Sequence, residues 1–172
     1  ICYVNLVGGQ DELVFDGGSL IVSPQGSVIA SAKQFEEDLM VTDLEISNIR
    51  AKRTRTSKII SVRQTLPKKE KRIVKQRKSK CLTQDERIYQ ALVLGTRDYA
   101  RKNGFQKAVL GLSGGIDSSL VAVIAADALG KDNVIGVTMP SQYTSQGTNT
   151  DAKRLADNLG IQFMEAPIEE IF

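Results

Sequence analysis

The first 45 residues alternate short apolar runs with glycine-containing breaks, a pattern typical of β-strands and tight turns. Residues 19–23 and 27–31 are two such runs, and Pro24-Gln25-Gly26 stands between them. Two short apolar runs around a turn of this kind predict a β-hairpin.

Further strands are predicted on either side of this hairpin. A β-rich run covers residues 2–7, where Gly8-Gly9 ends it, and Leu13-Val14-Phe15 precedes another break. We expect residues 35–49 to be a strand-rich exit from the same region, because acidic residues are interspersed there among apolar ones. Lone hairpins are marginally stable in water, so these strands require a larger sheet.

The pattern changes near residue 82 to helices alternating with strands. Thr83-Gln84-Asp85-Glu86 is a capping box that opens a helix, and Asn103-Gly104 is a stop signal for it. The apolar residues near one face of this helix are Ile88, Leu92 and Tyr99. Three apolar strands are then predicted at 108–112, 134–139 and 161–165, with helices at 118–129 and 150–158 between them.

This order of elements predicts the fold class. Strand, helix, strand, helix and strand with short connections imply right-handed crossovers. We therefore expect an α/β fold with a doubly wound parallel sheet, and helices on both of its faces. The fully apolar strand from Ala108 to Leu112 is typical of a buried parallel strand.

Positive charge is concentrated between the two regions. The net charge is +3, yet residues 50–80 hold 14 of the 23 Lys and Arg residues and only one acid, Glu70. We interpret residues 46–81 as a solvated basic linker kept open by self-repulsion. Contact with nucleic acid or an anionic surface is the alternative, but no aromatic side chain is present in the basic run to stack on bases. We therefore do not expect a nucleic-acid partner.

The composition excludes several classes of site. There is no histidine, which removes Ser-His-Asp catalysis, Cys-His catalysis and histidine-ligated metals. Cys2 and Cys81 are too few for a four-cysteine zinc site or a disulfide framework, so a reducing, cytoplasmic setting is expected. No apolar run approaches the ~20 residues that span a bilayer, and no signal peptide is visible.

The two ends predict a piece of a longer chain. The sequence opens at Ile1 without a methionine, directly in strand-like residues, and stops at Phe172 within an alternating pattern. We expect residues 1–45 to be the end of one domain and residues 82–172 to be the start of another.

The segment from Gly111 to Ser119 carries the chemistry. It joins the strand at 108–112 to the following helix, at the carboxyl end of the strand, where doubly wound sheets bind ligands. Gly114-Gly115 lets backbone N–H groups approach an anion, and the helix N-terminus adds positive potential. Three serine hydroxyls supply further donors, which predicts a phosphate site.

Asp117 is the unusual member of this segment. A carboxylate beside phosphate oxygens is repulsive unless a divalent cation bridges them, so Asp117 predicts Mg²⁺. The alternative is that Asp117 only caps the helix, but capping explains neither the two glycines nor the three serines. No lysine precedes Ser118 or Ser119, which excludes a Walker A loop, and the dinucleotide motif Gly-x-Gly-x-x-Gly is absent.

The run from Ser113 to Ser119 resembles the SGGxDS signature of the ATP pyrophosphatase (PP-loop) superfamily. Members have an adenine nucleotide alpha hydrolase-like fold, cleave ATP between the α and β phosphates, and hold pyrophosphate in this loop. The resemblance implies that ATP is bound by Gly111, Leu112, Ser113, Gly114, Gly115, Ile116, Asp117 and Ser118, with Asp117 on the metal.

The flanking residues narrow the resemblance. Gly136 to Ser141, with Tyr143-Thr144-Ser145, is similar to NAD synthetases, and residues 3–19 resemble the closing strands of a nitrilase-type (carbon-nitrogen hydrolase) glutaminase domain. A nitrilase-type α/β sandwich before a PP-loop domain is the arrangement of the glutamine-dependent NAD synthetase family. The expected domains are thus a glutaminase end at 1–45, a linker at 46–81 and a synthetase start at 82–172.

The resemblance implies ATP-dependent amidation of deamido-NAD (nicotinate adenine dinucleotide) to NAD through an adenylate, with Mg²⁺ and with ammonia from glutamine. The family's Glu-Lys-Cys triad cannot be assigned here, because Cys2 lacks the family's following acid and is better interpreted as a buried strand residue, as is Cys81. We expect this chain to be inactive alone and the full-length enzyme to be a homo-oligomer. The alternative is another PP-loop enzyme, such as a tRNA-modifying ligase, although residues 82–172 hold no cysteine for thiolation.

Overall fold

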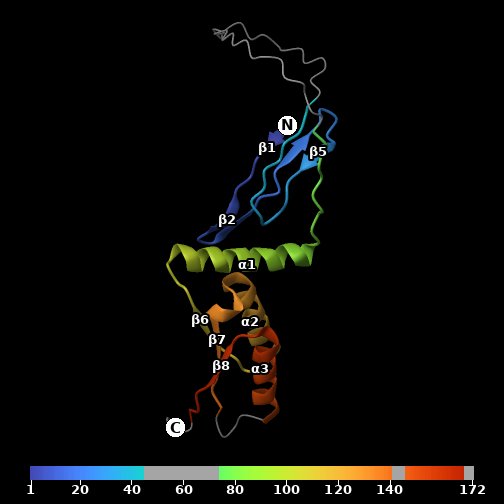
Figure 1. The fold of residues 1–172 in the computed structure, drawn as a ribbon. Helices are drawn as coiled ribbons and strands as arrows, with labels where there is room; N and C mark the ends of the chain where they lie inside the picture. The colour runs from blue at the N-terminus through green and yellow to red at the C-terminus, as the bar shows by residue number, and fades with distance from the viewer. Residues whose placement is uncertain (45–73, 141–145, 169–172) are drawn as a thin grey trace.

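A computed structural model of the chain describes residues 1–44, 74–140 and 146–168. Figure 1 shows a group of antiparallel strands at the N-terminal end and a parallel α/β unit at the C-terminal end. Helix α1 (Gln84–Lys102) lies between them and contacts both. Within the described residues, no helix is long and apolar enough to cross a membrane.

The hairpin predicted around Pro24-Gln25-Gly26 is confirmed. Strands β4 (Leu20–Val22) and β5 (Val28–Ser31) pair antiparallel, and β1 (Cys2–Tyr3) completes a sheet of order β1-β4-β5. Cys2 lies in a strand as expected, but it is exposed and not buried, because no layer of the described chain covers β1. Cys81 is also exposed.

A second hairpin corrects the prediction that Gly8-Gly9 ends a strand. Both glycines lie inside β2 (Val7–Gln10), which pairs antiparallel with β3 (Leu13–Asp16). The chain reverses two residues later, where Asp11 takes φ +50°. The glycines were misinterpreted as a break because their contacts are made with α1, far along the sequence.

The expected strand-rich exit is not found in its described part, residues 35–44. Single hydrogen bonds hold the start of this segment, such as the bond from Phe35 N–H to the Asp16 carbonyl.

The end of the basic linker is more ordered than predicted. Ser31 N–H donates to the Arg77 carbonyl, Ser79 N–H donates to the Ser31 carbonyl, and Arg77 pairs with Asp38. Residues 45–73 lie outside the described residues.

The capping box of α1 is confirmed in both directions. Glu86 N–H donates to Thr83 Oγ1 at 3.2 Å, and Thr83 N–H donates to Glu86 Oε2 at 2.7 Å. The helix buries Leu94 and Ala100, whereas the predicted apolar face stays largely exposed within the described chain. The exposed members of that face are Ile88, Leu92 and Tyr99.

The predicted parallel sheet is confirmed. Strands β6 (Ala108–Gly111), β7 (Val134–Thr138) and β8 (Gln162–Glu165) are parallel neighbours in that order. Helix α2 (Ile116–Leu129) and the short helix η1 (Lys131–Asn133) connect β6 to β7, and α3 (Gln146–Leu159) precedes β8.

Helices cover one face of this sheet in the described residues, and not both as expected. The strands follow chain order without a reversal, and right-handed crossovers in one direction place α2 and α3 on the same side. A doubly wound sheet needs a reversal of strand order before helices reach its second face. That face carries Val109 and Met164, which are 67% and 49% exposed.

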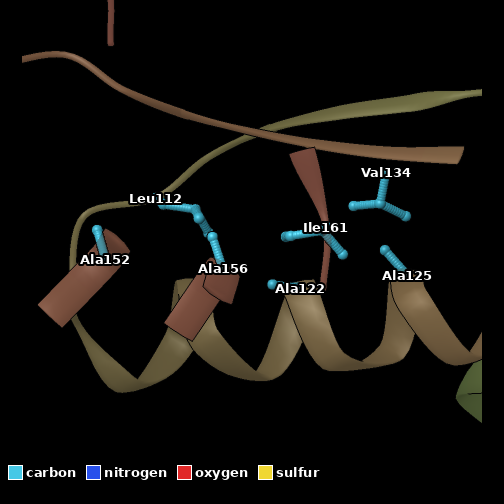
Figure 2. Packing of buried hydrophobic residues seen from close by; sticks show 7 residues of the cluster. All are labelled: Leu112, Ala122, Ala125, Val134, Ala152, Ala156 and Ile161. Atoms are coloured by element: carbon cyan, nitrogen blue, oxygen red, sulfur yellow. The ribbon is translucent and has the colours of Figure 1, made fainter. Parts of the chain in front are cut away.

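The core lies between this sheet and its two helices. Figure 2 shows small side chains of α2 and α3 meeting larger ones of the strands and loops. Because alanines line the inner faces of α2 and α3, both helices pack close to the sheet. Leu112, which begins the glycine- and serine-rich segment, belongs to this core. The buried members are Leu112, Ala122, Ala125, Val134, Ala152, Ala156 and Ile161.

Candidate phosphate-binding site

The glycine- and serine-rich segment lies where the sequence predicts, between the carboxyl end of β6 and the first turn of α2. The chain turns at Gly114, whose φ of +74° is in the left-handed region that favours glycine. Gly115 is the N-cap of α2 and provides no side chain to it. No side chain at the N-cap therefore shields the first turn of α2.

Leu112 anchors the start of the loop in the core. Its side chain is 2% exposed and belongs to the core, and its N–H donates to the Val137 carbonyl at 2.8 Å. Of the residues predicted to bind ATP, Leu112 thus has its side chain in the core and its N–H already bonded. Its role in the geometry is to fix where the loop begins.

The serine hydroxyls bond within the loop. Ser113 Oγ and Ser118 Oγ are 3.1 Å apart, and Gly115 N–H donates to Ser113 Oγ at 3.3 Å. Ser118 Oγ and Ser119 Oγ lie 3.1 Å and 2.8 Å from the Gly115 carbonyl, to which both donate. These contacts bring the three serines predicted as phosphate donors into one cluster around the start of α2.

The N-termini of α1 and α2 differ in a way that matters for anions. A side-chain capping box closes α1, whereas α2 has no side-chain cap. The first N–H groups of an α-helix lack partners within the helix, and they carry the positive end of its dipole. The first turn of α2 is therefore open to an anion at the carboxyl edge of the sheet.

Asp117 stands in that first turn, and its geometry argues against the capping alternative. Gly115, and not Asp117, occupies the N-cap position. Asp117 is exposed, and within the described ranges its carboxylate makes no hydrogen bond or ion pair. A carboxylate held beside the anion-binding turn is free to contact a cation that also contacts a bound phosphate.

The residues present fit a magnesium ion of this kind. Among the described residues there is no cluster of three or more Cys, Asp or Glu side chains that could hold a metal alone. Mg²⁺ commonly binds through one or two carboxylates together with substrate phosphates. Asp117 beside the open turn provides one carboxylate, which suits a cation that arrives with a nucleotide.

The next strand contributes polar groups that the sequence analysis did not single out as a pair. Thr138, at the end of β7, is 4% exposed, and Thr138 Oγ1 lies 2.9 Å from Asn149 Oδ1 of α3. Met139 Cε would lie 3.4 Å from a Cβ on Gly111, so Met139 covers the start of the loop. The sequence could place Thr138 near the loop, because β6 and β7 end side by side at residues 111 and 138. Nothing in the sequence pointed to its partner Asn149 on α3. The flanking residues 141–145 lie outside the described residues.

Two family profiles match the chain. Residues 88–172 match NAD synthase, and residues 1–54 match carbon-nitrogen hydrolase. The two regions have these family assignments in the order that the sequence resemblance implied. The boundaries at 45 and 82 stay predictions.

Relatives with both regions resemble the whole chain. The glutamine-dependent NAD(+) synthetases of Aquifex aeolicus and Thermotoga maritima are 49% and 46% identical to it, and each alignment covers 100% of this chain and 32% of the relative. A solved glutamine-dependent NAD+ synthetase from Acinetobacter baumannii, in complex with ADP, has a TM-score of 0.75 and 39% identity over 99% of this chain and 28% of that one.

The two family matches and the order of the sheets define a carbon-nitrogen hydrolase region followed by an NAD synthase region. The chain belongs to the glutamine-dependent NAD(+) synthetase family. It spans about a third of the length of the curated relatives it matches.

Proposed function

We propose that the whole protein converts deamido-NAD to NAD, using ATP with Mg²⁺ and ammonia released from glutamine. The observation that carries this proposal is the open first turn of α2, ringed by Ser113, Ser118 and Ser119 and flanked by Asp117. The names of the relatives support the choice of substrate.

The loop would act on the leaving group of the first step. A nicotinate carboxylate oxygen attacks the α-phosphorus of ATP. The bond between this phosphorus and the oxygen bridging the α and β phosphates breaks, and pyrophosphate leaves. Negative charge grows on the pyrophosphate, and the unpaired N–H groups of the first turn of α2 would stabilise it, joined by serine hydroxyls that turn away from the Gly115 carbonyl. When bound, Mg²⁺ would neutralise phosphate charge, with Asp117 as its protein ligand.

The second step needs no charged group of the described loop. Ammonia attacks the acyl carbon of the nicotinate adenylate, and AMP leaves with the electron pair of the broken carbon–oxygen bond. We propose that the ammonia comes from a glutaminase site in the carbon-nitrogen hydrolase region. None of its triad is assignable to Cys2 or Cys81, so we expect the 172-residue chain to form no NAD and to hydrolyse no glutamine.

The setting of the enzyme is part of the same proposal. We expect a cytoplasmic homo-oligomer, with deamido-NAD and glutamine as its small-molecule partners and no nucleic-acid or membrane partner.

The test compares substrates in the whole protein. With ATP, Mg²⁺, deamido-NAD and either glutamine or ammonium, we expect equal amounts of NAD, AMP and pyrophosphate. AMP that appears only when tRNA is added would contradict the proposal in favour of a tRNA-modifying ligase. Formation of NAD by the 172-residue chain would contradict the expected inactivity of that chain.

A further inference from the structure

A single residue of hairpin β2–β3, Gly9, is held at both its N–H and its carbonyl by helix α1. Gly9 N–H donates to Asp98 Oδ2 at 2.8 Å, and the Gly9 carbonyl accepts from Lys102 Nζ. Lys102 Nζ also donates to Gln10 Oε1 at 3.1 Å. Asp98 and Lys102 are four residues apart and therefore adjacent on one helix face. We call this pair and its target the Gly9 clamp.

The charges of the clamp match the two Gly9 backbone groups that they hold. The acceptor Asp98 carries the negative charge and faces the N–H, while the donor Lys102 carries the positive charge and faces the carbonyl. Hydrogen bonds with one ionised partner are stronger than neutral ones. The Asp98 side chain is only 17% exposed, with Arg97 Nε 3.4 Å from its other oxygen, so water competes weakly for it.

Glycines on both sides allow this close approach. A Cβ on Gly9 would lie 3.1 Å from Gly95 Cα and 3.4 Å from Asp98 Cβ. A Cβ on Gly95 would lie 3.3 Å from Val14 Cγ2. Glycine inside a helix costs about 1 kcal/mol relative to alanine, so Gly95 weakens α1 at the point where the hairpin packs on it. The backbones themselves therefore form the contact.

The clamp joins the two regions. Gly9 belongs to the carbon-nitrogen hydrolase match, and Asp98 belongs to the NAD synthase match, 89 residues further along the chain. On another side, α1 packs on α2, where Tyr89 Oη donates to Asp127 Oδ2 at 2.5 Å. Because α2 begins at the phosphate loop, a continuous path of packed elements links the hairpin to the loop (Figure 1).

We propose that the Gly9 clamp is the joint that fixes the carbon-nitrogen hydrolase region on the synthase region, and that use of glutamine requires this joint whereas use of free ammonia does not. This inference rests on the proposed function. Ammonia released in one region reaches an acyl adenylate in the other only while the two are aligned, and small misplacements cost large factors in rate. Ammonia supplied from solution needs no such alignment.

The joint itself is tested without activity, by amide hydrogen exchange of the whole protein. Asp98→Asn removes the charge of the acceptor, and Asp85→Asn is the matched control on the same helix. We expect peptides from residues 7–16 to exchange about tenfold faster in Asp98→Asn, the factor for loss of a hydrogen bond to a charged group. Peptides of β6 and β7 should be unchanged. Equal hairpin exchange in the two variants would overturn the joint.

A steric variant tests the same joint with all charges kept. Gly9→Ala adds one methyl group, and the Gly9 backbone lies outside the left-handed region, so the change introduces no backbone strain. We expect it to reproduce the faster exchange of residues 7–16, because the methyl group meets Gly95 Cα, which cannot rotate away. Unchanged exchange would show that the close approach plays no part.

The functional arm compares nitrogen donors in the whole protein. Asp98→Asn and Lys102→Ala should lower NAD formation from glutamine about tenfold and leave NAD formation from ammonium within about twofold. Arg101→Ala, the neighbouring basic residue, is the control for Lys102→Ala. Equal losses with both donors, or no loss with glutamine, would overturn the coupling role. If wild-type protein makes no NAD from ammonium, the proposed function fails, and the exchange experiment still decides whether the joint exists.

Discussion

The side chain of Leu112 occupies the space that a Cβ on Gly136 would fill. Such a Cβ would lie 2.4 Å from Leu112 Cδ1 and 3.1 Å from Leu112 Cγ. Leu112 is the residue before the serine and glycine loop, and Gly136 is the middle residue of β7. The neighbouring strand therefore fixes the start of the loop by leaving room for one leucine side chain.

The first prediction concerns this pair. Gly136→Ala should push Leu112 out of its position and lower the free energy of unfolding by about 1–3 kcal/mol, the usual cost of an overpacked core. Urea unfolding of the 172-residue chain measures the change. In a Leu112→Ala background the same substitution should cost much less, because the clashing atoms are gone. Equal costs in both backgrounds would mean that the two residues do not compete for space.

The second prediction separates the chemistry of Asp117 from its structural role. Because the carboxylate is exposed and has no partner in the described chain, Asp117→Asn should change the free energy of unfolding by no more than about 0.5 kcal/mol. In the whole protein it should abolish release of pyrophosphate from ATP and deamido-NAD. Asp132→Asn, an exposed acid on η1, is the control. Full activity of Asp117→Asn would remove Asp117 from the site.

The third prediction is a titration of Tyr89. Its hydrogen bond to Asp127, together with burial and the negative charge of that carboxylate, raises the pKa of Tyr89 from 10.0 to about 12. The contribution of this hydrogen bond to stability is therefore fully present below pH 10.0 and is lost as the pH rises through about 12. Tyrosinate absorbance of the wild-type chain should include a late step at the raised pKa of Tyr89. Tyr89→Phe should remove that late step, and identical late titration in this variant would assign it elsewhere.

The fourth prediction concerns acid and the start of α1. The Thr83 backbone N–H, and then the Lys80 ammonium, hold the pKa of Glu86 below its ordinary value of 4.5. The folded chain thus favours the ionised carboxylate. The contribution of this carboxylate to the free energy of unfolding is present above about pH 4.5 and is lost as the pH falls through the lower pKa of the folded state.

Glu86→Gln isolates this contribution because glutamine can still accept the Thr83 bond but does not titrate. Urea unfolding of both chains between neutral pH and acid should give a stability difference that shrinks on acidification. Other acids titrate in both chains and cancel from the difference. A difference that stays constant with pH would show that the ionised form of Glu86 has no advantage in the folded state.

The sequence alone determined the local features of this protein. The capping box at Thr83, the Pro24-Gln25-Gly26 turn and the individual apolar strands each depend on residues within a few positions of one another. The loop from Ser113 to Ser119 is equally local, because an anion-binding turn needs only its own glycines, its hydroxyls and the helix that follows. This locality explains why most of the candidate site could be predicted.

Only the tertiary structure decided the features that depend on distant residues. Gly8-Gly9 looks like a strand break in the sequence, yet it lies within β2. The reason is that its backbone packs against Gly95 and bonds to Asp98, both more than 80 residues away. Gly136 has no meaning without the Leu112 side chain beside it. In both cases a glycine is required by atoms of another element, and such a requirement leaves no periodic or local signal in the chain.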